Sequence, residues 1–194
     1  MKKVFFRKRL NAIIIAGVVM ALSTLFGINR SLGGKNLQVA DCFNVGVYSK
    51  QQGYTLKSIR SQLIVRTEAS MNTLTVSDKY DEASDESKAL RAARNRLMDL
   101  LYEEEASPPE LFKANRALES AYNNLYGRLL LLDLDEGDKA NLQQDHSRMR
   151  GAASQIEKSG YNEAVRQYRR EVLSVFPTNI LRKFCFTPEP ELFE

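Results

Sequence analysis

A stretch of nineteen residues without a charged side chain, Leu10 to Ile28, constrains this chain more than any other feature of its sequence. An α-helix rises about 1.5 Å per residue, so a helix of this length matches the ~30 Å hydrocarbon core of a bilayer. A lone span must pair all its backbone groups within itself, and only a helix does so. The sequence therefore predicts a transmembrane helix over residues 10–28.

The charges on either side of this stretch predict its orientation, because cytoplasmic flanks carry an excess of Lys and Arg. Five cations precede it: Lys2, Lys3, Arg7, Lys8 and Arg9. Only Arg30 and Lys35 follow closely. We expect residues 1–9 to form a cytoplasmic basic tail. The chain from Asn29 to Glu194 is then expected outside a cell membrane that the protein crosses once.

A cleaved signal peptide is the competing interpretation of the same region, because it also joins a basic start to an apolar run. Ser31-Leu32-Gly33 offers a small-x-small pattern for cleavage. The apolar run is long for a signal peptide, however, and this pattern lies late. Both observations favour an uncleaved anchor.

The net charge of +4 comes from the N-terminal region rather than from the rest of the chain. The chain has 28 Lys and Arg against 24 Asp and Glu, and residues 1–28 hold five of the cations and no acid. The remainder therefore has 23 cations against 24 acids, a net charge of −1. Such a mixed surface has no basic field to attract nucleic acid, and we expect no nucleic-acid partner.

Apolar residues recur at helical spacing in four segments of the remaining chain, in a background rich in good helix formers. The first two stripes are Leu56, Ile59, Leu63, Ser70 and Leu74, then Leu90, Ala93, Leu97, Leu100 and Leu101. The third is Leu111, Ala114, Leu118, Ala121, Leu125, Leu129 and Leu132. The fourth is Leu142, Met149, Ala152, Ile156, Tyr161, Val165, Tyr168, Val172 and Val175. Each stripe predicts one helix with a buried face.

Capping and turn residues separate these segments. Residues 81–86 and 133–138 are expected to be helix junctions, and Pro177 is expected to end the fourth helix. Ser107-Pro108-Pro109-Glu110 fits a capping box with proline at the first helical position, so the third helix should begin there. A loose juxtamembrane segment is expected over residues 29–53.

Four helices with narrow Leu/Ala stripes and short turns bury those stripes best as an antiparallel up-down four-helix bundle. The predicted fold is therefore all-α, with a single transmembrane helix followed by the bundle. The expected domains are the basic tail at 1–9, the transmembrane helix at 10–28, the juxtamembrane segment at 29–53 and the bundle at 54–194.

The sequence offers few groups for catalysis or metal binding. His146 is the single histidine, it follows Asp145 without the Glu-x-x-His spacing of di-iron bundles, and it is expected on a wet helix face. Residues 133–138 depart from a calcium loop, because the glycine falls one place early and Gln144 replaces the bidentate acid. Glu103 to Glu105 are interpreted as a solvated acidic run. We predict no catalytic, cofactor-binding or metal-binding residue, and no enzyme.

Two cysteines leave one question open. Cys42 follows the apolar stretch and Cys185 lies near the end of the chain, so a bridge between them would close most of the chain outside the membrane. The alternative is two separate thiols. A single pair without a spacing motif is weak evidence for a disulfide, which favours the thiols.

Several motifs carry a resemblance to a known family. Residues 161–168 (Tyr-Asn-Glu-Ala-Val-Arg-Gln-Tyr), 175–181 (Val-Phe-Pro-Thr-Asn-Ile-Leu) and 184–194 resemble the end of LemA-family proteins. Gly127-Arg128-Leu129-Leu130 matches as well, and a fainter match runs from Gln62 to Tyr80. The chain departs from the family in having no Trp, and in Phe184-Cys185-Phe186 where the family has Phe-Gly-Phe.

The resemblance implies a bacterial, single-span protein with an antiparallel four-helix bundle and no established enzymatic activity or ligand. Some relatives are linked to membrane organelles or to membrane proteases. We therefore expect a non-catalytic scaffold of the cell envelope, whose partners are the lipid bilayer and an envelope protein, including a second copy of this chain. The alternative is an accessory subunit of a membrane enzyme such as a protease. The residues themselves predict that the aromatic tail folds back over the end of the bundle.

Overall fold

A computed structural model describes residues 2–49, 53–80, 84–103, 106–176, 178–184 and 188–194. The described chain is mainly helical and begins with one long apolar helix, which confirms the all-α prediction at this level. It divides into two compact units. The first unit comprises Met1–Val39 and Val165–Pro190, and the second comprises Ala40–Ala164 and Glu191–Glu194.

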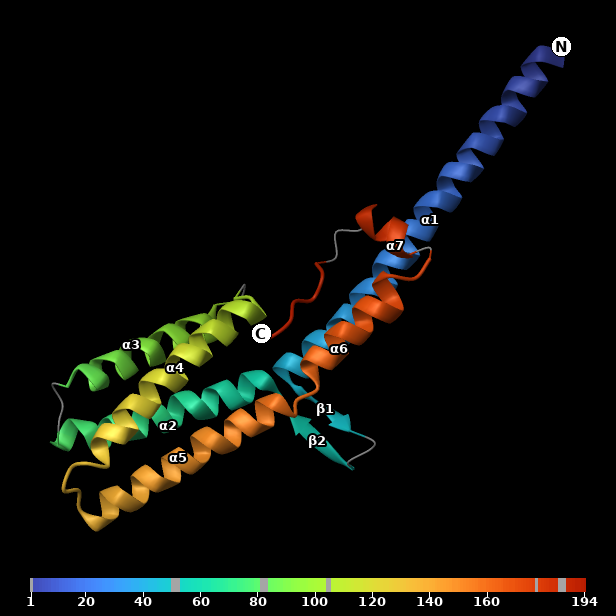
Figure 1. The fold of residues 1–194 in the computed structure, drawn as a ribbon. Helices are drawn as coiled ribbons and strands as arrows, with labels where there is room; N and C mark the ends of the chain where they lie inside the picture. The colour runs from blue at the N-terminus through green and yellow to red at the C-terminus, as the bar shows by residue number, and fades with distance from the viewer. Residues whose placement is uncertain (1, 50–52, 81–83, 104–105, 177, 185–187) are drawn as a thin grey trace. The chain divides into compact units, whose positions relative to one another are not determined.

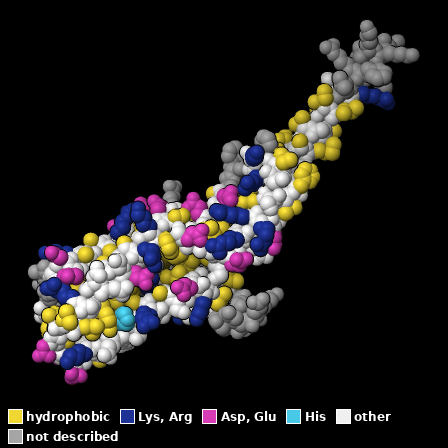
Figure 2. All heavy atoms as spheres, viewed as in Figure 1, with side chains coloured by type: hydrophobic (Ala, Val, Ile, Leu, Met, Phe, Trp, Pro, Cys, Tyr) yellow, Lys and Arg dark blue, Asp and Glu magenta, His cyan; other side chains and the backbone are white. Residues whose placement is uncertain are grey.

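Helix α1, Lys2–Asn44, supplies the N-terminal part of the first unit (Figure 1). Among the described helices it is the one that is long and apolar enough to cross a membrane, and its most apolar stretch of 18 residues has no buried residue. Figure 2 shows hydrophobic side chains along its outer surface. Within residues 11–28, the large apolar side chains that are more than half exposed are Ile13, Ile14, Ile15, Val18, Val19, Met20, Leu22 and Phe26.

The expectation of a loose segment over residues 29–53 is wrong for most of its length. Helix α1 continues to Asn44, and its buried residues Leu32, Val39 and Phe43 recur at the spacing of one helix face. Gly33 and Gly34 do not break the helix, because this apolar face continues across them.

A β-hairpin follows α1 in the second unit. Strand β1, Gly46–Ser49, pairs antiparallel with β2, Tyr54–Lys57. Gly46 has a φ of 93°, and a Cβ there would lie 2.3 Å from the backbone oxygen of Leu56. Only glycine fits this conformation and this close approach. The sequence pattern missed the hairpin because each strand has only four residues.

Four helices make up most of the second unit: α2 (Ile59–Tyr80), α3 (Asp85–Tyr102), α4 (Pro108–Leu129) and α5 (Glu136–Glu157). They lie side by side in Figure 1. Helix α2 packs against α5 and α3, and α3 packs against α4. Their completely or almost completely buried side chains include Leu63, Leu74, Leu90, Leu97, Leu111, Leu118, Leu125, Leu129 and Leu142.

Local capping explains where three of these helices begin. Ser84 accepts a hydrogen bond from the Ser87 N–H at 3.1 Å at the start of α3. The Ser107 N–H donates to the Glu110 carboxylate at 3.0 Å, and α4 begins at Pro108 as predicted. Asp135 caps α5. Of the junction expected at 81–86, residues 81–83 lie outside the described part of the chain.

The fourth predicted helix is not continuous. Helix α5 ends at Glu157, and Gly160 has a φ of 73°, a left-handed conformation that stops a helix. Helix α6 (Tyr161–Tyr168) follows, continued by a π-helical turn η1 (Arg169–Leu173), then α7 (Thr178–Leu181) and the 3₁₀ turn η2 (Arg182–Phe184). Pro177, the expected end of the helix, lies outside the described residues.

The last residues of the chain fold back onto the second unit, as predicted. Phe193 is buried, and its ring centroid lies 5.8 Å from that of Phe43 and 5.3 Å from that of Phe112. The Asn162 side chain donates to the Phe193 carbonyl at 3.0 Å and accepts from its N–H at 2.8 Å. The Tyr161 hydroxyl donates to the Glu191 carbonyl at 2.6 Å. These contacts fix the tail on both its apolar and its polar side.

Candidate functional site

A small cavity between α2, α4 and α5 collects the most unusual polar groups of the second unit. Its volume is about 220 Å³. The lining includes two cations, two carboxylates, one tyrosine and the single histidine of the chain. Its charged and aromatic lining includes Arg66, Glu119, Tyr122, His146 and Arg150.

Arg66 places a charge inside the packed helices. Its side chain is 3% exposed, and its Nη2 lies 3.5 Å from Oε2 of the partly exposed Glu119. Its Nε is buried and has no hydrogen-bond partner. Burial lowers the pKa of Arg66, and the carboxylate of Glu119 opposes this shift. A guanidinium stays charged under such conditions, so Glu119 is the group that neutralises it.

His146 is partly exposed, and its ring packs against the two tyrosines of α4, a contact that the sequence did not predict. Its ring stacks on Tyr126 with centroids 4.1 Å apart, and the Tyr122 ring centroid lies 6.1 Å away. Its Nδ1 is buried without a hydrogen-bond partner. Burial, with a contribution from Arg150, lowers the pKa of His146, so the imidazole is neutral at neutral pH.

Tyr122 is equally unreactive in this setting. Burial raises the pKa of Tyr122 to about 12, and the Thr73 hydroxyl donates to its oxygen at 3.4 Å. An imidazole stacked on tyrosine rings is a packing arrangement. The ion pair and the stacked rings beside the cavity support helix packing more than acid–base chemistry.

A second polar cluster joins α2 to α5, through two aspartates seven residues apart. Asp138 is buried, lies 2.8 Å from the Lys79 ammonium and accepts from the Tyr80 hydroxyl at 3.0 Å. The hydrogen bond from Lys79 lowers the pKa of Asp138. Asp145 accepts from Asn72 at 3.1 Å, and burial raises the pKa of Asp145. The pKa values of these two carboxylates on α5 are therefore shifted in opposite directions.

The acidic run at residues 133–138 is a helix-linking turn, as predicted. Helix α4 ends at Leu129 and α5 begins at Glu136, with Asp135 accepting from the Asp138 N–H at 2.7 Å. Within the residues that the structure describes, no group of three or more His, Cys, Asp or Glu side chains is placed to hold a metal ion.

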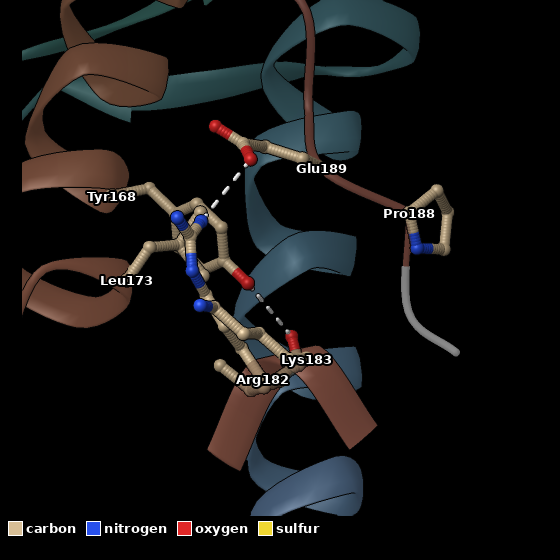
Figure 3. Close-up of a pocket in the computed structure, with 7 residues that line it drawn as sticks. Tyr168, Leu173, Arg182, Lys183, Pro188 and Glu189 are labelled. Carbon is tan, nitrogen blue, oxygen red and sulfur yellow. Dashed lines mark hydrogen bonds and ion pairs between the residues drawn. The ribbon is translucent and has the colours of Figure 1, made fainter. Parts of the chain in front are cut away.

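The first unit has a pocket of its own, of about 240 Å³ (Figure 3). The Tyr168 hydroxyl donates to the Leu32 carbonyl of α1 at 3.5 Å, and Arg182 pairs with Glu189 at 3.2 Å. Arg169 also pairs with Glu189, again at 3.2 Å. Burial raises the pKa of Tyr168. These polar groups are occupied in holding the C-terminal segment beside α1.

The remaining residues singled out from the sequence do not join these clusters. Glu103 is exposed at the end of α3, and Glu104 and Glu105 lie outside the described residues. Cys42 is half-buried, and burial raises the pKa of its thiol. Cys185 also lies outside the described residues, so the choice between a disulfide and two thiols stays a prediction.

The burial of Arg66 is the feature that the sequence analysis missed. The signal was present, because Arg66 falls between Leu63 and Ser70 on the buried face of α2 at helical spacing. Its partner is 53 residues away in the sequence, however, and no local pattern identifies it.

No family model matches the chain, and no curated protein matches it.

Proposed function

We propose that this protein is a membrane-anchored, non-catalytic scaffold that holds a helical domain at the cell envelope and binds a protein partner there. The single observation that supports the anchor is the row of eight large apolar side chains exposed on α1. Moving them from water into lipid is favourable by on the order of 10 kcal/mol or more. Water is therefore a poor environment for this helix.

The proposed orientation places the basic tail in the cytoplasm and the helices from α2 onward outside it. The five cations before residue 10 support this orientation. Sixteen further residues of α1, Asn29 to Asn44, follow the proposed span as continuous helix. At 1.5 Å per residue they reach about 24 Å, enough to carry the chain clear of the headgroups.

The proposed fold of the second unit is an antiparallel up-down four-helix bundle of the LemA kind. The packing of α2 with α3 and α5, the packing of α3 with α4, and the short α4–α5 turn support it. The sequence motifs near the C-terminus supply the resemblance to that family.

Partner binding is supported by two apolar side chains on the outer face of α2. Ile64 and Met71 are each 43% exposed and stand seven residues apart, so they occupy the same helix face. A helix of a partner protein fits such a stripe. Two exposed side chains form a modest contact, which matches a weak or transient association better than a permanent one.

A topology reporter tests the anchor and its orientation. A reporter active only outside the cytoplasm, fused after Glu194, is expected to be active, and a cytoplasmic reporter at the same point is expected to be silent. The reverse pattern in stably produced protein would overturn the orientation.

Proximity labelling from the second unit tests the partner. The double variant Ile64→Ser, Met71→Ser is expected to lose the labelled envelope partner, whereas the control Leu130→Ser, Leu131→Ser, on other exposed leucines, keeps it. If the labelled protein that the double variant loses is a membrane protease, this result would support the accessory role. Labelling of only lipid and self would overturn the accessory role, and labelling of self that is unchanged in both variants would exclude Ile64 and Met71 as the contact.

A further inference from the structure

Three large apolar side chains stand exposed close together in the C-terminal part of the first unit. Val175 is 51% exposed, Phe176 75% and Ile180 52%. They follow the buried Leu173, so the chain turns its apolar side chains outward after η1. The Asn179 N–H donates to the Val175 carbonyl at 2.9 Å, which keeps Val175 and Ile180 in adjoining turns of the chain.

The contacts of the first unit place the neighbours of this segment beside α1. Leu32 of α1 lines the same pocket as Leu173, Arg182 and Lys183, as Figure 3 illustrates for the last three. The Asn36 side chain donates to the Pro188 carbonyl at 2.9 Å. Figure 1 also draws α7 next to α1. The segment 175–180 is therefore bracketed by residues that contact α1 around Leu32.

This level on α1 is the end of the proposed membrane span. Leu32 lies four residues after Ile28, which is about 6 Å along a helix. The interfacial layer between hydrocarbon and water is about 5–8 Å thick on each side of a bilayer. Leu25 and Ile28 are half-buried on the face that includes Leu32, whereas residues 11–24 are exposed. The protein begins to cover α1 at the depth where the interface should lie.

We propose that Val175, Phe176 and Ile180 form a second membrane contact, inserted into the lipid interface beside α1. This inference rests on the proposed membrane anchor. The occupant is the lipid surface, because the residues on both sides of the patch contact α1 at the depth of the interface. Aromatic and aliphatic side chains are favourable in this layer.

The charges next to the patch fit the same occupant. Lys183 is exposed and follows Ile180 by three residues, so its ammonium can reach headgroup phosphates while its stem lies along the apolar surface. Arg182 is held by Glu189 and contributes less. An apolar edge next to a cation is the arrangement of an interfacial lipid contact.

The chain has no tryptophan, which gives a clean test. In the full-length protein reconstituted into vesicles of phosphatidylcholine and phosphatidylglycerol, Phe176→Trp becomes the sole tryptophan. We expect blue-shifted emission, protection from iodide, and roughly half of the emission lost in lipids brominated on the acyl chain. The matched control Tyr102→Trp, at a position 79% exposed on α3, is expected to be quenched by iodide and unaffected by bromine.

A third variant, Val18→Trp in the proposed span, separates the two proposals. If Trp at 18 is quenched by brominated lipid but Trp at 176 is as accessible to iodide as the control, the anchor stands and the second contact is refuted. If Trp at 18 is also unquenched, the anchor itself fails and the inference fails with it. Protection of position 176 from iodide without quenching by bromine would mean that protein, such as a second copy of this chain, covers the patch, and would equally overturn the lipid contact.

Discussion

Helix α1 exposes large apolar side chains, whereas helix α2 buries polar ones. Over residues 11–28, α1 exposes isoleucine, valine and phenylalanine, whereas α2 buries Arg66, Thr67, Ser70, Thr73 and Ser77 among packed helices. Two of these buried hydroxyls find a partner on α2 itself, since Ser70 donates to the Arg66 carbonyl at 2.7 Å and Thr67 to the Ile64 carbonyl at 2.8 Å. The large apolar side chains listed for α1 remain more than half exposed.

The polarity of a side chain therefore does not by itself decide whether that side chain is buried or exposed in this molecule. Small polar side chains that satisfy themselves on their own helix let neighbouring helices approach α2 closely, on the sides facing α3, α4 and α5. Large apolar side chains without a protein partner point instead to an apolar medium.

The largest effect is expected from charges placed in the apolar surface of α1. Two arginines introduced by Ile15→Arg and Val18→Arg should make membrane insertion less favourable by about 5–7 kcal/mol, because each charge near the centre of a span costs about 2.5–3.5 kcal/mol. The protein should shift from the membrane fraction to the soluble or aggregated fraction, as measured by fractionation with alkaline extraction. The control pair Ile15→Leu, Val18→Leu should remain in the membrane. Retention of the arginine variant would mean that α1 is not held by lipid.

The second effect tests the apolar core that surrounds α2. Leu118 is fully buried, and Leu118→Ala should lower the free energy of unfolding by about 2–5 kcal/mol, through lost burial and a cavity. The same substitution at Leu131, which is 87% exposed, should change it by less than about 0.5 kcal/mol. Denaturant unfolding of the detergent-solubilised protein measures both. Equal effects would contradict the packing of α4.

The third effect concerns the buried charge of α2. Glu119→Gln leaves the Arg66 guanidinium without a counter-charge and should cost about 1–3 kcal/mol. Arg66→Met removes the buried charge together with its unpartnered Nε, and should be neutral or stabilising. The unfolding midpoints of the two variants measure these effects. If Arg66→Met were strongly destabilised and Glu119→Gln unchanged, the ion pair would not account for the burial of Arg66.

A smaller pair of effects separates satisfied from unsatisfied hydroxyls on α2. The buried Ser77 oxygen has no hydrogen-bond partner, so Ser77→Ala should stabilise the protein by about 1 kcal/mol. Ser70 donates a hydrogen bond, so Ser70→Ala should be destabilising by about 0.5–1.5 kcal/mol. Thermal unfolding of the two variants side by side measures the signs, and the same sign for both would remove the distinction.

The last prediction uses the two aspartates that tie α5 to α2, which should respond to acid in opposite directions. The pKa of Asp138 is held below its ordinary value of 3.8 by Lys79, so its stabilisation is complete above that value and lost as the pH falls through the lower folded pKa. The pKa of Asp145 is raised by burial, so its ionisation weakens the fold at neutral pH and this penalty disappears on acidification.

The matched variants follow from these signs. Asp138→Asn should destabilise the protein at neutral pH and reduce its loss of stability near pH ~3, and Asp145→Asn should stabilise it at neutral pH. Urea midpoints of both variants across this range provide the measurement. If the stability of the two variants changed with pH in parallel, the opposite pKa shifts of Asp138 and Asp145 would be contradicted.

Sequence patterns predicted what depends on neighbours along the chain. The apolar run of α1 and the start of α4 at Pro108 follow from composition and a capping box, and both are found. The return of the tail was predicted from aromatic residues too apolar for water, and Phe193 is buried between two rings. Each of these features is determined within a few residues or by solubility alone.

The predictions failed where the structure depends on a single backbone angle or on a contact between residues far apart in the sequence. The fourth stripe predicts one helix through Ile156 and Tyr161, although these two stand five residues apart and neighbours on a helix face stand three or four apart. The left-handed Gly160 lies in this gap. The stacking of His146 on Tyr126 and the pairing of Arg66 with Glu119 join separate helices. Tertiary contacts of this kind leave no trace in local periodicity.

The polar face of α2 has a consequence for biosynthesis. Helices α2, α4 and α5 are each 22 residues, about 33 Å, which is long enough to cross a bilayer. A translocating channel that samples segments for lateral release into lipid would find α1 free of charge in its apolar stretch, and α2 carrying Arg66 and Glu68 within its first half. Under the proposed single-span topology, the charged side chains of α2 would thus also keep this helix out of the bilayer during translocation.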